Sequence, residues 1–297
     1  MAAVRDDFPS PKQLLEARHL RPRKRFGQNF LTDPRVAERI ARSLPPRAYV
    51  LEIGGGTGTL TAALLEHAAS VTTLEIDRDL AAILEERFAL LGGRLRIVAG
   101  DVLEFDLRGD LAAQFAPRAI CGNLPYYITT PIIERIFEAG DLWECAILMV
   151  QHEYARRMVA TPGSEHYGSL TVFAGYFAQA EKLFDVGSAG FYPPPDVAST
   201  VVRLTPRSDR HKRVRNERLL LWLIRAAFSH RRKTFVNSVL ASMRGGNASI
   251  RKELESALRA RGLDLVIRGE RLTLADFCEL ADTLGEGHIR EHQWTTR

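Results

Sequence analysis

The sequence predicts an α/β protein with a doubly wound, mostly parallel sheet, followed by a smaller α-helical domain. Between residues 49 and 151, short apolar runs alternate with segments of helical spacing, as in βαβ units. Beyond Pro206, every apolar run has helical spacing. The 297 residues, 45% of them hydrophobic, can bury one full-sized core and a smaller one.

The elements follow in order along the chain. Five apolar runs are expected to form parallel strands: YVLEI, VTTLEI, RLRIV, RAIC and CAILMVQ. Between them, LTAALLEHA, DLAAILEERFALL and PIIERIFEA have helical spacing. EKLFDV and ASTVVRLTP flank the turn FYPPPD and predict a late hairpin at the sheet edge. Four C-terminal helices are expected in RLLLWLIRAAF, KTFVNSVLASM, IRKELESALRA and TLADFCELADTL, the last capped by Thr273 with Asp276.

Basic residues cluster in two places and indicate a polyanionic partner. The formal charge is only +5, but 203–233 holds eleven Lys or Arg against two acids, and RPRKR fills 21–25. Nucleic acid is the commonest such partner, although a solvated charged face is the alternative for either run. We expect a flexible basic arm at 1–25, a catalytic domain at 26–205 and a helical RNA-binding domain at 206–297. The RNA-binding candidates are Arg23, Lys24, Arg25, Arg231, Arg232 and Lys233.

Other composition features narrow the class of protein. The three cysteines are far apart and form no CxxC pair, so neither a zinc site nor a disulfide framework is indicated. The N-terminus lacks the apolar core of a secretory signal, and no run reaches the roughly 18 apolar residues of a membrane span. His152-Glu153 lacks a second histidine at position 156, which excludes a zinc-protease helix. A cytoplasmic, monomeric protein without a metal is expected.

Three predicted strand ends carry residues suited to a nucleoside cofactor. The first strand leads into a glycine loop with Gly54, Gly56 and Gly58; Glu75 ends the second and Asp101 follows the third. Ligands of open parallel sheets lie at these carboxyl ends. Glu75 can accept ribose hydroxyls and Asp101 an exocyclic amine. The glycine spacing, G-x-G-x-G, resembles motif I of S-adenosylmethionine-dependent methyltransferases. An NAD site is the second choice, because Thr59 stands where the dinucleotide motif needs Gly or Ala.

The fourth strand end, Asn123-Leu124-Pro125-Tyr126, predicts chemistry on an aromatic amine. The lone pair of adenine's exocyclic amine is delocalised, so the amine is a poor nucleophile. The Asn123 side-chain oxygen and the Leu124 carbonyl could accept its hydrogens and direct the lone pair at a methyl donor, with Pro125 stiffening the turn. Tyr126 offers a face on which a flipped base can stack. Alternatively, the segment simply ends a strand and Tyr126 covers the sheet.

Taken together, the motifs resemble those of the bacterial small-subunit ribosomal RNA adenine dimethyltransferases. KRFGQNFLTD, LEIGGGTGTLT, LEIDRDL, GNLPYYITTPI, YGSLTV, FYPPPDVASTVVRL and FSHRRKTFVNSV match in the family's order over about 210 residues. The resemblance implies a Rossmann-like methyltransferase sheet and dimethylation of two adjacent adenosines in the 3′-terminal hairpin loop of 16S rRNA. It implies that Phe191 faces Tyr126 across the target base, although the sequence alone leaves Phe191 a possible core aromatic. It also implies that S-adenosylmethionine is bound by Gln28, Asn29, Leu31, Gly54, Glu75, Asp101 and Asn123.

The sequence departs from the family's motifs at two places, and two other functions remain as alternatives. GGGTG replaces the usual GPGxG, and Tyr127 stands where Asn is frequent. Related 23S rRNA methyltransferases usually carry NIPY and lack the triple proline, so Leu124 and the run 193–195 favour the small subunit. A protein of another class, an RNA-binding ribosome-assembly factor whose methylation is dispensable, would use the same basic clusters.

Overall fold

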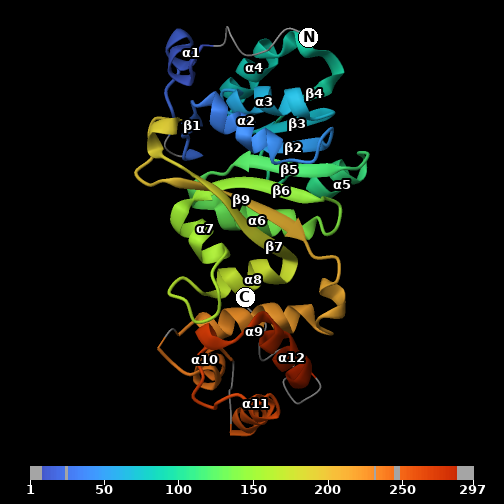
Figure 1. Cartoon of the computed structure of the whole chain (residues 1–297), viewed down its shortest axis with the longest axis vertical. Helices are drawn as coiled ribbons and strands as arrows, with labels where there is room; N and C mark the ends of the chain where they lie inside the picture. The colour runs from blue at the N-terminus through green and yellow to red at the C-terminus, as the bar shows by residue number, and fades with distance from the viewer. Residues whose placement is uncertain (1–8, 24–25, 231, 244–247, 286–297) are drawn as a thin grey trace. The chain divides into compact units, whose positions relative to one another are not determined.

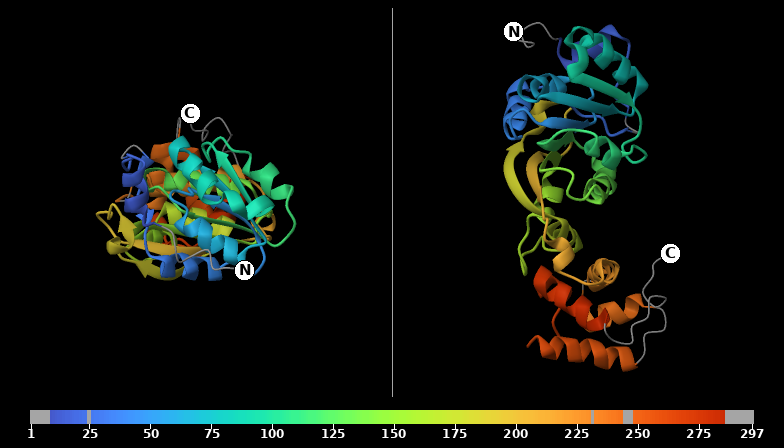
Figure 2. Two further views of the ribbon diagram at one scale, coloured as in Figure 1. Left: turned by 90° about the horizontal axis from the view of Figure 1, so that it is seen from above. Right: turned by 90° about the vertical axis from the view of Figure 1, so that its right-hand side faces the viewer.

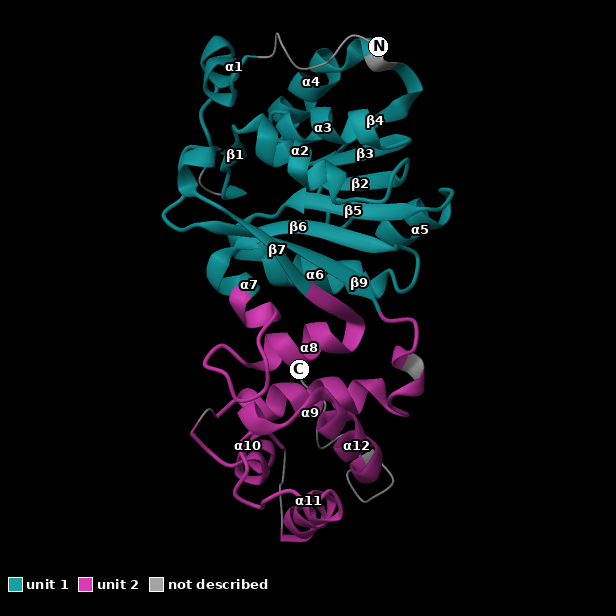
Figure 3. Ribbon diagram, viewed as in Figure 1, with its two compact units in different colours: residues 1–155, 181–206 teal, residues 156–180, 207–297 magenta. Residues whose placement is uncertain are grey.

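Figure 1 shows the computed structural model, which describes residues 9–23, 26–230, 232–243 and 248–285. The chain forms two compact units, coloured separately in Figure 3. Unit 1 contains residues 1–155 and 181–206, and unit 2 contains residues 156–180 and 207–297. The units differ from the expected division into 26–205 and 206–297, because residues 156–180 include a helix that packs with the C-terminal helices.

A seven-stranded sheet forms the frame of the molecule, as the sequence predicts. Its strands lie in the order β4-β3-β2-β5-β6-β9-β7. The pairs from β4 to β6 are parallel, and β6 pairs with β9 antiparallel, so the two late strands occupy the predicted edge. The strands are β2 (Tyr49–Ile53), β3 (Ser70–Glu75), β4 (Leu95–Ala99), β5 (Arg118–Asn123), β6 (Cys145–Gln151), β7 (Ala178–Val186) and β9 (Ser199–Pro206).

Helices cover the parallel strands on both faces, because these strands are apolar on both sides. α2 (Pro34–Arg42), α3 (Thr59–His67) and α4 (Arg78–Arg87) contribute to one core cluster with β2, β3, β5 and β6. α6 (Thr129–Glu138), which contacts α5 (Leu107–Ala112), lies on the other face (Figure 2). The chain runs outward from β2 to β4 and then returns to β5, so the loops after β2 and β5 diverge. Ligands of open α/β sheets bind at such a switch point.

The described part of the segment 1–25 contains a packed helix, where the sequence predicts a flexible arm. α1 (Pro11–Ala17) begins with a capping box between Ser10 and Gln13. Its Leu15 is only 3% exposed and belongs to an apolar cluster with Phe30, Leu80 and Ile83. The chain then enters β1 (Phe30–Leu31), which pairs antiparallel with β8 (Phe191–Tyr192). Apolar residues among the charges therefore anchor this segment.

Unit 2 is helical, and its described core is built around α9 (Glu217–Phe228), which contacts α8, α10 and α12. Phe277 packs against the rings of Phe228 and Phe235. The predicted cap at Thr273 is confirmed: its hydroxyl accepts from the backbone N–H of Asp276, whose carboxylate accepts from Thr273 N–H at 2.9 Å. The other helices are α7 (His152–Met158, shared with unit 1), α8 (Ser169–Phe177), α10 (Phe235–Ser242), α11 (Ala248–Ala260) and α12 (Leu274–Gly285). Short 3₁₀ turns occur at Ala89–Arg94, Tyr126–Ile128, Ser188–Gly190, Arg210–Lys212 and Gly269–Arg271.

Candidate active site

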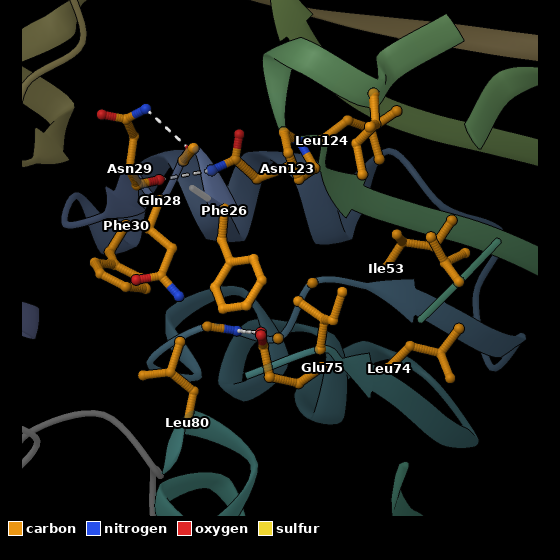
Figure 4. Close-up of a pocket in the computed structure, with 18 of the residues that line it drawn as sticks. Phe26, Gln28, Asn29, Phe30, Ile53, Leu74, Glu75, Leu80, Asn123 and Leu124 are labelled. Carbon is orange, nitrogen blue, oxygen red and sulfur yellow. Dashed lines mark hydrogen bonds between the residues drawn. The ribbon is translucent and has the colours of Figure 1, made fainter. Parts of the chain in front are cut away.

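A cavity lies at the carboxyl ends of the central strands in unit 1, where the switch point predicts one (Figure 4). About 990 Å³ of space lies between its walls and in its mouth, counted out to open solvent. Apolar walls with a few convergent polar groups are typical of small-ligand sites. Apolar side chains form much of its wall, among them Phe26, Ile76 and Leu80. The predicted residues that line it are Gln28, Asn29, Leu31, Gly54, Gly56, Glu75, Asp101, Asn123, Leu124, Pro125 and Tyr126.

The glycine loop after β2 presents backbone to this cavity. Gly54 and Gly56 have φ of 80° and 55°, in the left-handed region that favours glycine. Gly58 was predicted as a cofactor contact, but it does not line the cavity. It is the N-cap of α3 with φ of 85°, and a β-carbon there would lie 2.8 Å from the Phe88 ring. Gly58 is therefore required for turning and packing the chain.

Two carboxylates lie in the wall where the sequence places them. Glu75 is 5% exposed, and its oxygens accept the N–H groups of Gly56 at 2.8 Å and Asp77 at 2.9 Å. Burial raises the pKa of Glu75, while these hydrogen bonds oppose the rise. Asp101 accepts from Leu103 N–H through Oδ1, and its Oδ2 has no hydrogen-bond partner among the described residues. Both residues offer acceptors in fixed positions.

The strand end after β5 is oriented by two hydrogen bonds. The Nδ2 of Asn123 donates to the carbonyl of Asn29 at 2.9 Å (Figure 4), which leaves its Oδ1 unengaged within the described chain. Leu124 N–H donates to Met149 O at 3.0 Å, and its side chain is 1% exposed. The Leu124 carbonyl accepts no hydrogen bond from a described residue. Pro125 follows with φ of −60°. Two acceptor oxygens, one side-chain and one backbone, thus remain available at the cavity.

A second hollow adjoins the first, and Tyr126 and residues 27–29 line both. The hydroxyl of Tyr126 lies 2.8 Å from Ser199 Oγ, which holds the half-buried ring in place. The expected ring opposite it, Phe191, is 4% exposed, belongs to the core of the sheet and lines neither hollow. Successive strand residues point to opposite sides, and the aromatic that lines the second hollow is Tyr192. The predicted sandwich of Tyr126 and Phe191 across a base stays a prediction, and Tyr192 is a further aromatic at the second hollow.

Sequence reasoning missed several residues of these two hollows. Glu16 and residues 19–22 line the second one, whereas the sequence predicts a flexible arm there and names only Arg23, Lys24 and Arg25 as contacts. Packing of the N-terminal segment against distant apolar residues, such as Leu80 and Ile83, brings these residues to the hollow. No local sequence pattern indicates that position. Ile76, 40% exposed, directly follows β3 and could have been found as the last apolar residue of the predicted strand VTTLEI.

The basic candidates separate into different environments. The guanidinium of Arg23 pairs with Asp77 at 2.6 Å and also with Asp79, so it is held against unit 1. Arg232 and Lys233 are exposed, and neither has an ion-pair partner among the residues that the structure describes. Lys24, Arg25 and Arg231 lie outside the described residues.

The strand order and the polar groups at the strand ends define the class of protein, an α/β methyltransferase. The chain belongs to the ribosomal RNA adenine dimethylase family, whose model matches residues 19–266. This membership removes the NAD-dependent alternative.

Relatives and solved structures agree with this family. A relative from Lachnoclostridium phytofermentans is 42% identical over 268 residues, which are 89% of this chain and 91% of the relative. One from Methylococcus capsulatus is 40% identical over 269 residues, 90% and 99% of the two chains. Both are called ribosomal RNA small subunit methyltransferase A. A dimethyladenosine transferase from Plasmodium falciparum matches with a TM-score of 0.72 at 29% identity, over 84% of this chain and 95% of that one.

The 23S rRNA methyltransferase ErmE matches less well, with a TM-score of 0.64 at 26% identity, over 87% of this chain and all of that one.

Among the described helices, none is both long and apolar enough to cross a membrane.

Proposed function

We propose that the chain transfers methyl groups from S-adenosylmethionine to N6 of two adjacent adenosines in the 3′-terminal hairpin loop of 16S rRNA, two methyls to each. The observation that carries this proposal is a pair of acceptors at one strand end, Asn123 Oδ1 and the Leu124 carbonyl, that accept no hydrogen bond from any described residue. They lie in the wall of a cavity suited to a nucleoside. The 40 to 42% identity to small-subunit enzymes favours that substrate over 23S rRNA.

The residues of the first cavity fit the cofactor. Glu75 offers carboxylate oxygens for two ribose hydroxyls, and Asp101 Oδ2 can accept from the adenine amine. Gly54 and Gly56 bring backbone to the cavity without a side chain, and a β-carbon on Gly56 would lie 3.1 Å from the Phe30 ring. S-adenosylmethionine, when bound, supplies an electrophilic methyl group on a sulfonium centre.

The chain's own contribution is to position the target amine. Asn123 Oδ1 and the Leu124 carbonyl would each accept one hydrogen of the amine, which favours a tetrahedral nitrogen with its lone pair directed at the methyl donor. No general base is needed, because the alkylated nitrogen is positively charged and acidic and can lose its proton to water. Tyr126, held by Ser199, offers its ring for stacking on the extruded base. Tyr192, which also lines the second hollow, offers a further aromatic ring beside it.

Replacing Asn123 tests the positioning role. We expect Asn123→Ala to lower kcat about 100-fold, since one of two acceptors is lost, while the Kd for RNA stays within about twofold of wild type. The measurement is single-turnover methylation of undermethylated small subunits, with product mapping. Thr130→Ala, a change at the exposed start of α6, is the matched control. Normal dimethylation by Asn123→Ala would refute the proposed role.

A ribosome-assembly role is the second candidate. The exposed Arg232 and Lys233, which form no ion pair with a described residue, favour it as much as they favour the enzyme. Both roles belong in the cytoplasm, where small subunits mature. A strain lacking the enzyme separates them: Asn123→Ala restores growth if binding suffices, and fails to restore it if methylation is required.

A further inference from the structure

Asp77 does not line the cofactor cavity, but it contacts three segments that do or that adjoin it: the end of β3, the start of α4 and the N-terminal segment. It follows Glu75 by two residues, and its side chain is 4% exposed. Its backbone N–H donates to Glu75 Oε1 at 2.9 Å, and its Oδ1 accepts the N–H of Asp79 at the start of α4. The residue therefore fixes the carboxylate assigned to the ribose and the N-terminus of the neighbouring helix.

The same carboxylate holds the N-terminal segment. Asp77 Oδ1 accepts from Arg23 Nη1 at 2.6 Å, and Asp77 Oδ2 accepts from Gln28 Nε2 at 3.0 Å. The other end of the Gln28 amide accepts from the Arg23 backbone N–H at 2.8 Å. Arg23, Gln28 and Asp77 thus close a ring of three hydrogen bonds. A nearly buried carboxylate with a charged donor and an amide donor makes a strong attachment.

The segment held by this ring forms one wall of the cavity. Phe26, Gly27, Gln28 and Asn29 all line it (Figure 4). The carbonyl of Asn29 in turn accepts from Asn123 Nδ2 and so decides where Asn123 Oδ1 lies. A continuous path of contacts leads from Arg23 to the acceptor assigned to the target amine.

We propose that Arg23, Gln28 and Asp77 are positioning residues, which hold the wall of residues 26–29 against the cofactor site and so set both cofactor affinity and the orientation of Asn123. The inference rests on the proposed function and adds residues to it. It also reassigns Arg23, predicted above as an RNA contact, to the cofactor side of the reaction.

The experiment compares two arginines of one segment. Arg23 and Arg18 both pair with acidic residues of α4, Asp79 and Glu86 respectively, and neither arginine lines a hollow. Only Arg23 also pairs with Asp77, so Arg18 controls for attachment to α4 alone. Calorimetry measures the Kd for S-adenosylhomocysteine, which requires no turnover. Hydrogen exchange reports on peptides covering 26–31, and kcat is measured at saturating cofactor. The variants are Arg23→Ala, Asp77→Asn, the double variant and the control Arg18→Ala.

We expect Arg23→Ala and Asp77→Asn each to raise the Kd about tenfold, and the double variant to add little, because both remove one contact. Exchange at 26–31 and kcat should change with the Kd, whereas Arg18→Ala should stay within about twofold of wild type. If Arg23→Ala does not fold, Arg23→Lys, which keeps the charge but not the fork of donors, should show the same changes to a smaller degree.

Two results would overturn the inference. One is an unchanged Kd and exchange rate in Arg23→Ala with a raised Kd for RNA, which would restore Arg23 as an RNA contact. The other is an equal loss in Arg18→Ala, which would show that general attachment of the segment is responsible. Failure of wild type to bind S-adenosylhomocysteine would instead refute the proposed function, and the exchange data would still test the network.

Discussion

At the scale of single residues, the most unusual group is a carboxyl buried inside the sheet. Glu52 of β2 is fully buried, and its Oε2 accepts from the hydroxyls of Thr61 and Thr73. Its Oε1 has no hydrogen-bond partner in the described structure. Burial raises the pKa of Glu52 to about 7; the two threonine hydrogen bonds oppose this, and the charge of Glu75 adds to it. Glu52 is therefore a group whose proton is taken up on folding.

This shift predicts a pH dependence of stability. The folded pKa, about 7, lies above the ordinary value of 4.5, so the stabilisation is complete below pH 4.5 and is lost as pH rises through 7. Glu52→Gln cannot ionise. The free energy of unfolding of this variant, minus that of wild type, should rise by on the order of 3 kcal/mol between these pH values. Urea titrations across the range measure it; parallel stability curves would contradict the argument.

Gly58 shows how a motif residue can serve the fold rather than the ligand. An alanine at position 58 would be strained for two reasons. The backbone φ is 85°, and the Phe88 ring lies 2.8 Å from the position of a β-carbon. We expect Gly58→Ala to lower the free energy of unfolding by about 2 kcal/mol. Chemical denaturation measures this, and Gly100→Ala, at a glycine with open space around it, is the control.

At the scale of elements, helices and strands with a strong apolar periodicity could be predicted from the sequence, and those with a weak periodicity could not. β2 and β6 begin and end where their apolar runs do. α8 was missed, because its sequence SLTVFAGYF is apolar nearly all round and rich in β-branched and aromatic residues, which favour strands. α1 was missed because seven residues with a proline and charges carry little periodic signal. Both helices form because their apolar side chains are buried by distant parts of the chain.

The cap of α12 was readable in sequence and gives a prediction for that helix. Thr273→Ala removes the hydroxyl that accepts from Asp276 N–H, and should cost about 1 kcal/mol. Faster hydrogen exchange in the first turn of α12 measures the loss. Thr283→Ala changes the same residue type at the other end, where the hydroxyl bonds only to Glu279 O within the helix, and should have little effect. Equal effects of the two changes would argue against the cap.

At the scale of the whole molecule, charge distribution matters more than net charge. The formal charge of +5 is small for 297 residues. Some arginines of the basic runs form hydrogen bonds or ion pairs with other residues of the chain. Arg203 donates to the carbonyl of Ser43, and Arg213 pairs with Asp209. Arg232 and Lys233, in contrast, are exposed beside the start of α10 and are available to phosphates.

A salt titration tests this distinction. If Arg232 and Lys233 each contact one phosphate, replacing both by Ala should reduce the slope of log K for RNA against log salt by about 1.5. The Kd for S-adenosylhomocysteine should not change. Arg35→Ala, at an exposed arginine already paired with Asp33, is the control and should leave the slope unchanged. An unchanged slope in the double variant would exclude these contacts.

The sequence by itself determined the class of sheet, the strand ends that carry Gly54, Glu75, Asp101 and Asn123, and the family. It could do so because these features are local: apolar periodicity, turn chemistry and short motifs at strand termini. Only the tertiary structure decided the rest. Phe191 is buried while Tyr192 lines the second hollow, and Arg23 is bound to Asp77. Those outcomes depend on contacts between segments more than fifty residues apart, which no local pattern specifies.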